Sequence, residues 1–142
     1  MTAEPIDKKP TRRRFTVDEY HRLAETGILT RQDRVELVEG EIIEMTPIGS
    51  RHAGHVAKLD QLMSANAGGR ATIWVQNPVR LGRFSEPEPD VAVLHPRDDF
   101  YAKRHPRPED VLLLIEVAET SLRYDRDKKL PLYASAGIPE CW

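Results

Sequence analysis

Residues 112–119, LLLIEVAE, are the stretch that decides the fold of this chain. From Val111 to Val117 the side chains are almost all apolar, a pattern typical of a strand covered on both faces of a sheet. Glu116 interrupts this run. Burying a lone carboxylate costs several kcal/mol, so Glu116 needs a cation, a hydrogen-bonding partner or a proton.

A second carboxylate lies upstream, where Asp90 begins the predicted strand 90–94. The preceding segment, residues 86–89 (EPEP), favours an extended approach because a residue before proline avoids the α region. If the two strands are neighbours, Asp90 and Glu116 can share one hard cation, and oxygen ligands suit magnesium. A lysine from the following helix would then orient and polarise an attacking water.

The alternative interpretation of these residues is structural. Glu116 could point to solvent or form an ordinary ion pair with Lys129, and single carboxylates of this kind are more often structural than catalytic. The combination of two carboxylates with a downstream lysine favours the catalytic interpretation.

The rest of the chain predicts further helices and strands. Thr16 and Glu19 have the spacing of a capping box, which predicts a helix over 17–25. Residues 34–45 predict a hairpin that turns at Glu39-Gly40. The remaining predicted elements are a helix from Ser50 to the glycines at 68–69, strands 72–76, 79–81, 90–94 and 111–117, and a helix over 127–136. This order predicts an α/β sandwich whose mixed central sheet is flanked by helices.

Composition is that of an ordinary globular domain. The 142 residues fit one domain, of which 39% are hydrophobic and 31% charged. No apolar run approaches the roughly 20 residues of a membrane-spanning helix, and the first residues lack the apolar stretch of a secretory signal. Cys141 is the single cysteine, which excludes an intramolecular disulfide and a cysteine-based zinc site. We therefore expect a cytoplasmic protein with no membrane partner.

The formal net charge of −2 argues against a protein that merely coats nucleic acid. Basic residues are nonetheless concentrated in residues 1–14, which we expect to form a disordered arm ahead of a folded domain over 15–142. Such an arm could contact the phosphates of a nucleic acid, although basic runs are more often solvated tails.

Four stretches carry a resemblance to a known family. They are RVELVEGEIIEMTP (34–47), SRHAGHV (50–56), EPEPDVAVL (86–94) and LLIEVAETSLRYDRDKKLPLYASAGIPECW (113–142). Over nearly all of its expected folded length the chain resembles the Uma-two family of restriction endonucleases, a branch of the PD-(D/E)XK nuclease superfamily. The resemblance implies a restriction-endonuclease-like fold and a metal-dependent DNA endonuclease that uses Mg²⁺, with Mn²⁺ as a substitute.

The resemblance also implies roles for the two carboxylates. Asp90 matches the aspartate of the PD element, and Glu116 matches the second metal carboxylate. Glu36 matches a further acidic position and is implied as a ligand for metal or water.

The lysine departs from the superfamily pattern. Ala118 stands where the E-x-K spacing would place it. The resemblance instead implies Lys129, four residues after Asp125, with the neighbouring Lys128 as the alternative that helix phase does not settle.

Several polar and aromatic side chains are candidates for supporting roles. The resemblance implies that His52 lies near the site, where it could contact phosphate; with His55 it forms an i, i+3 pair that lacks an apparent third zinc ligand. Asp125 is expected to start a helix or form an ion pair close by. Tyr124 and Tyr133 are expected to pack, with stacking on a base as the alternative.

Family members usually continue into further strands beyond the position of Trp142, so we expect this domain to lack them and to expose a sheet edge. Three functions follow as hypotheses. They are a DNA endonuclease, a catalytically inactive nuclease-fold module that binds DNA, and a dimerisation domain in which Glu116 and Lys129 form a plain ion pair. A homodimer is one expected assembly.

Overall fold

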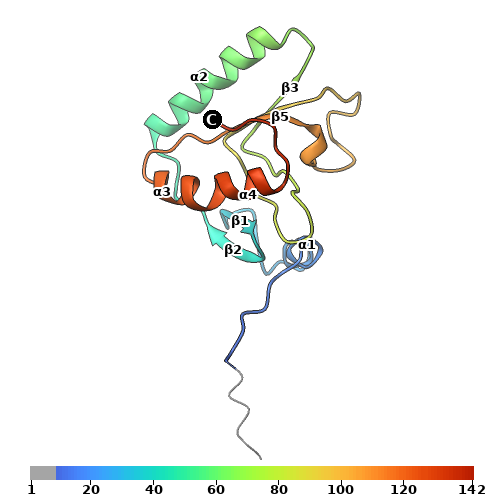
Figure 1. Cartoon of the computed structure of the whole chain (residues 1–142), viewed down its shortest axis with the longest axis vertical. Coiled ribbons are helices and arrows are strands. Elements are labelled where there is room, and N and C mark those ends of the chain that lie inside the picture. Colours follow the sequence, from blue (N-terminus) through green and yellow to red (C-terminus); the bar gives the residue numbers. More distant parts are fainter. Residues whose placement is uncertain (1–8) are drawn as a thin grey trace, which may run out of the picture.

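The computed structural model describes residues 9–142 and consists of helices packed on two small sheets (Figure 1). Its elements are α1 (Val17–Glu25), β1 (Val35–Val38), β2 (Glu41–Glu44), α2 (Ser50–Ala67), β3 (Thr72–Val75), β4 (Val91–Leu94), η1 (Pro108–Asp110), β5 (Val111–Ile115), α3 (Leu122–Tyr124), η2 (Asp125–Lys129) and α4 (Leu130–Ser135). α3, the π-helical turn η2 and α4 follow one another without a break and are termed here the α3–α4 segment. Within residues 9–142, no helix combines the length and apolar character that a bilayer crossing requires.

The central sheet has the order β3-β4-β5, with both pairs antiparallel. On one face, Val56 of α2 packs in a cluster with Leu113 and Ile115. On the other face, Leu114 packs in a second cluster with Tyr133 of α4. Alternate side chains of β5 thus enter two different apolar clusters, which explains why its sequence is apolar at nearly every position.

The outer edge of β5 is paired with residues 140–142. The Leu114 N–H donates to the carbonyl of Glu140 at 3.0 Å, and the Trp142 N–H donates to the carbonyl of Leu114 at 2.9 Å. These bonds form a parallel bridge between Leu114 and Cys141 beside the antiparallel strands. The predicted α/β class is therefore confirmed, and the central sheet is antiparallel except for this one parallel bridge. The edge that we expected to be exposed is paired at this point.

The β1–β2 hairpin turns at Glu39 and Gly40, as predicted. Their φ values of 51° and 82° are those of a tight turn with two left-handed central residues. The turn is held from both sides, because Phe15 N–H donates to the Gly40 carbonyl at 2.9 Å and Gly40 N–H donates to the Phe84 carbonyl at 2.7 Å. These bonds attach the hairpin to the residue before the N-cap of α1 and to the segment that leads into β4.

Two element predictions were wrong. Residues 79–81 are not a strand, because their amides donate to the loop carbonyls of Pro87, Pro106 and Ser85 and no ladder forms. The last helix begins at Leu122 rather than at 127. A proline inside an α-helix clashes with the carbonyl four residues earlier, and the wider π turn ahead of Pro131 relieves that conflict. The predicted capping box of α1 is confirmed, since Thr16 and Glu19 exchange both hydrogen bonds.

The expected basic arm is described only from residue 9 onward, and residues 1–8 lie outside the described residues. Arg12 pairs with Glu41 at 3.1 Å, and Arg13 pairs with Glu19 at 2.8 Å. The Arg14 guanidinium lies 3.9 Å from the centroid of the Phe84 ring. Because the two ion pairs are largely exposed, each contributes only about 0–1 kcal/mol.

Gly40→Ala should destabilise the protein more than Gly27→Ala. Both glycines have φ near +80°, which costs an alanine about 1–2 kcal/mol. A Cβ on Gly40 would also lie 2.5 Å from the Cβ of Arg14, whereas a Cβ on Gly27 would meet nothing within 4 Å. Chemical denaturation should show that Gly40→Ala lowers the free energy of unfolding by at least about 1 kcal/mol more than Gly27→Ala does. Equal losses would contradict the close packing of the turn.

Candidate active site

The six residues selected from the sequence line one cleft of about 390 Å³. The cleft lies between the β1–β2 hairpin, the first turn of α2, the adjacent ends of β4 and β5, and the α3–α4 segment, which passes between hairpin and sheet (Figure 1). The six residues are Glu36, His52, Asp90, Glu116, Asp125 and Lys129.

Asp90 and Glu116 lie across from each other on neighbouring strands. Val91 pairs with Ile115 in the antiparallel ladder, so Asp90 and Glu116 occupy the next position beyond the end of that pairing. Directly opposed residues share a face of a sheet. Both side chains accordingly line the cleft, and the charge of Asp90 contributes to the raised pKa of Glu116. The two carboxylates therefore meet on one side of the sheet.

Asp90 is held by two hydrogen bonds. Its Oδ2 accepts the backbone N–H of Val117 at 2.7 Å, and its Oδ1 lies 2.9 Å from Nε2 of His52. His52 reaches this position from the first turn of α2, whereas His55 is exposed on the same helix. His52 thus orients the Asp90 carboxylate.

Lys129 is buried and joins two carboxylates. Its Nζ lies 2.7 Å from Oε1 of Glu116 and 3.2 Å from Oε2 of Glu36. Burial lowers the pKa of Lys129, but the charges of Glu116 and Glu36 outweigh burial and hold that pKa above its usual value. Lys129 is therefore an ammonium ion in the cleft. Lys128 is exposed, so the structure places Lys129 rather than its neighbour beside the carboxylates.

Glu36 and Asp125 complete the surroundings of Lys129. Glu36 is buried on β1, and its Oε2 also accepts the N–H of Glu88 at 2.9 Å. Asp125 is buried in η2, accepts the Ser121 hydroxyl at 2.9 Å, and adds to the negative charge that raises the pKa of Lys129. Asp125 therefore acts on Lys129 through its charge.

Sequence analysis expected Tyr124 and Tyr133 only to pack or to stack on a base, and it gave Glu88 no role. The hydroxyl of Tyr133 donates to Oε1 of Glu116. The buried hydroxyl of Tyr124 has no hydrogen-bond partner among residues 9–142. Glu88 also lines the cleft. Two spacings could have indicated them, because Tyr133 follows Lys129 by four residues in a helix and Glu88 precedes Asp90 by two in an extended segment.

The electrostatics of the cleft favour a bound cation. Burial raises the pKa of Glu116 to about 7, even though Lys129 and Tyr133 both stabilise its charge. Burial and the neighbouring Glu36 likewise raise the pKa of Glu88 to about 7. The cleft that holds the buried Lys129 ammonium is thus lined by at least five carboxylates, those of Glu36, Glu88, Asp90, Glu116 and Asp125. Carboxylate oxygens are the donors that hard divalent cations prefer, so the residues present fit Mg²⁺ or Mn²⁺.

Comparisons with known proteins agree with this fold. A family model named Uma2 and described as "Putative restriction endonuclease" matches residues 17–142. A crystal structure described as "a putative nuclease belonging to DUF820 from Anabaena variabilis ATCC 29413" matches with a TM-score of 0.59 at 15% identity, over 80% of this chain and 65% of that chain. This chain thus spans slightly less than two thirds of that neighbour. No curated protein matches it. The predicted family resemblance and restriction-endonuclease-like fold are confirmed.

Glu88→Gln should stabilise the metal-free protein at high pH. Because the pKa of Glu88 is raised from 4.5 to about 7, the free energy of unfolding falls as the pH rises through that window. The variant should match the wild type near pH 4 and be more stable by about 1–2 kcal/mol at pH 8. Urea unfolding in EDTA would measure this, with the exposed Glu109→Gln as control. A difference in unfolding free energy between Glu88→Gln and the wild type that does not change with pH would contradict the raised pKa of Glu88.

Proposed function

We propose that this chain, which belongs to the Uma2 family, hydrolyses phosphodiester bonds in DNA with the help of a divalent cation. The observation that carries the proposal is the convergence of Asp90 and Glu116 on one side of the sheet, with the ammonium of Lys129 at 2.7 Å from Glu116. Two carboxylates and a lysine beside a cleft are the groups that metal-assisted hydrolysis of a phosphodiester requires.

Asp90 and Glu116 are the groups that would hold the cation. A bound Mg²⁺ would supply a Lewis acid that polarises the phosphate and acidifies water. The contacts of Glu116 with Lys129 and Tyr133 both use Oε1, which leaves Oε2 to serve as a ligand. His52 keeps the Asp90 carboxylate directed at the cleft, as partners of metal-ligating carboxylates do.

Lys129 and Tyr124 provide the remaining chemistry. In the reaction the oxygen of water bonds to phosphorus, the bond from phosphorus to the leaving oxygen breaks, and the two water protons pass to the solvent and to the leaving group. The Lys129 ammonium would orient the water and stabilise the added negative charge on the phosphate oxygens. The hydroxyl of Tyr124 is buried beside the cleft without a partner among the described residues, and it would donate to a phosphate oxygen once the side chain turned toward the cleft.

The basic residues before α1 would supply contacts that do not depend on DNA sequence. Arg12 and Arg13 are held only by exposed ion pairs, so exchange of these pairs for DNA phosphates costs little. Binding of this kind weakens steeply as salt concentration rises.

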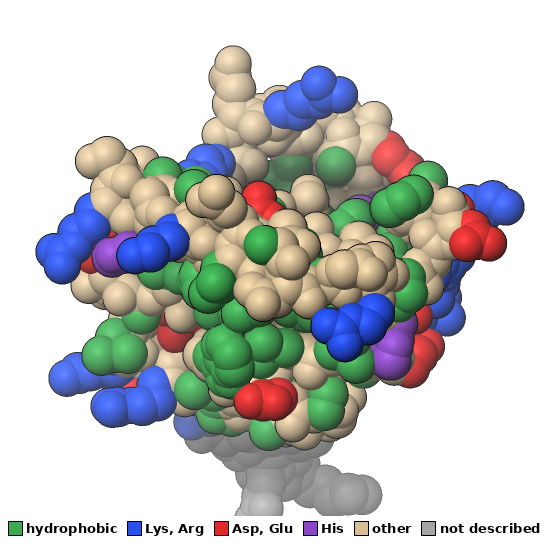
Figure 2. All heavy atoms as spheres, turned by 90° about the horizontal axis from the view of Figure 1, so that it is seen from above, with side chains coloured by type: hydrophobic (Ala, Val, Ile, Leu, Met, Phe, Trp, Pro, Cys, Tyr) green, Lys and Arg blue, Asp and Glu red, His purple; other side chains and the backbone are tan. Residues whose placement is uncertain are grey.

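A second candidate is a nuclease-fold module without turnover. In its favour, the Lys129 ammonium pairs directly with both Glu36 and Glu116, as a purely structural ion pair does. Figure 2 also shows hydrophobic side chains gathered near the centre of one face of the molecule. Such a surface is compatible with a dimerisation domain.

Asp90→Asn and Glu116→Gln should each lower magnesium-dependent nicking of supercoiled plasmid by at least about 100-fold, because each removes a charged ligand of the cation. Asp98→Asn, a change of an exposed aspartate outside the cleft, should nick at the wild-type rate. DNA binding without cleavage by the wild type in either Mg²⁺ or Mn²⁺ would favour the inactive module. Absence of both binding and cleavage would leave the dimerisation domain.

Lys129→Met should abolish cleavage, whereas Lys128→Met should retain it. The two lysines are neighbours, but only Lys129 is buried beside Glu116 and Glu36. Because Lys129→Met leaves two buried carboxylates without their ammonium, circular dichroism must first show that the variant is folded. Equal loss of nicking in the two folded variants would contradict the assignment of Lys129.

A further inference from the structure

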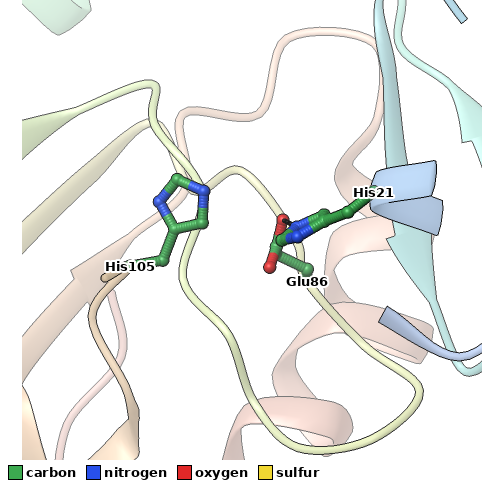
Figure 3. A group of neighbouring side chains, drawn as sticks. All are labelled: His21, Glu86 and His105. Carbon is green, nitrogen blue, oxygen red and sulfur yellow. Dashed lines mark hydrogen bonds and ion pairs between the residues drawn. The ribbon is translucent and has the colours of Figure 1, made fainter. Parts of the chain in front are cut away.

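A second pocket, of about 330 Å³, lies away from the active-site cleft and shares none of its lining residues. It is formed by α1, the segment before β4 and the loop between β4 and β5. His21, Glu86 and His105 face one another there (Figure 3). Neither the sequence analysis nor the proposed nuclease chemistry uses these three side chains.

The three side chains lie close enough together to become ligands of one metal ion. One ligand atom from each lies within 4.8 Å of the others. His21 Nε2 is 2.7 Å from Glu86 Oε1, and the two imidazole rings have centroids 5.9 Å apart at an angle of 76°. Two imidazoles on a tetrahedral zinc have centroids roughly 5 Å apart, given Zn–N distances of about 2.0–2.1 Å. Small rotations of the partly exposed histidines therefore suffice to bring the ligand atoms together.

Glu86 gives independent evidence that this pocket binds a cation. The residue is only 3% exposed, and its Oε2 is buried with no hydrogen-bond partner among the described residues. The carboxylate cannot easily withdraw, because the backbone of Glu86 is fixed by reciprocal bonds to Leu37 of β1. A buried carboxylate oxygen without a partner is costly, and a bound cation would satisfy it.

We propose that His21, Glu86 and His105 bind a divalent transition-metal ion, with zinc as the preferred ion. Two imidazoles and one carboxylate form a ligand set that suits zinc and leaves a fourth position open, whereas magnesium prefers oxygen ligands alone. The site is thus chemically distinct from the carboxylate-rich cleft.

The charge of the surrounding residues defines what occupies the fourth position. Arg80 is paired with Asp18 at 3.2 Å, and Arg104 is paired with Asp110 at 2.6 Å. Because carboxylates neutralise these two guanidiniums, they repel a bound metal cation only weakly. Lys103 and Arg107 also line the pocket. Their charge favours an anionic fourth ligand, such as a phosphate oxygen, over a neutral one.

Zinc titration of the full chain after removal of metals with EDTA tests the proposal. Calorimetry should show one strong site per chain. His105→Ala and His21→Ala should each weaken it by at least about 100-fold, because losing even an outer partner of a ligand costs about 10-fold to 100-fold. His55→Ala, which removes an exposed histidine on α2, should bind zinc as the wild type does. Unchanged affinity in His105→Ala, or no zinc binding by the wild type, would overturn the proposal.

A second set of measurements separates this site from the cleft. Asp90→Asn should keep the strong zinc site, and loss of zinc binding in that variant would place the metal in the cleft instead. Cobalt bound in place of zinc should give the intense visible absorption of a tetrahedral site, absent in His105→Ala. Inorganic phosphate should shift that spectrum, and an unchanged spectrum would overturn the anionic fourth ligand. None of these readouts depends on DNA cleavage.

Discussion

The buried ammonium of Lys129, held between Glu116 and Glu36, is the interaction on which the rest of the structure depends. It joins the β1–β2 hairpin to the end of β5 and to the α3–α4 segment, and its contact with Glu36 spans 93 residues of sequence. Two buried carboxylates so close together would repel each other without this cation. The Lys129 ammonium therefore both permits the three elements to pack and lies where the proposed chemistry needs a cation. One side chain serves folding and function together.

The antiparallel pairing of β4 with β5 supplies the second constraint. Their register places Asp90 and Glu116 opposite each other just beyond the paired residues, where the strands end and a cleft can open. A shift of the register by one residue would turn one carboxylate to the other face of the sheet. Apolar side chains on both faces of β5 resist such a shift, because each face packs against its own cluster. Packing far from the cleft thus fixes the geometry within it.

Local signals in the sequence predicted much of this arrangement. The capping box of Thr16 and Glu19, the turn at Gly40 and the misplaced charge of Glu116 all depend on near neighbours in the chain, and the structure has each where it was expected. Contacts between distant segments were not predictable in this way. The bond from the Arg80 N–H to the Pro106 carbonyl and the meeting of His21 with His105 arise from tertiary packing, which periodicity does not encode.

The π turn that carries Lys129 also bears on how the chain tolerates a change of length. A π turn holds one residue more than an α-helical turn does. Deleting one residue from Asp125–Lys129 would narrow the wide turn to an α-helical one, so α3 would keep its orientation relative to Tyr133. Pro131 would then lie inside an α-helix, where its ring clashes with the carbonyl four residues earlier. The length of this turn is therefore constrained by the proline that follows it, even where the exposed residues of the turn are free to vary.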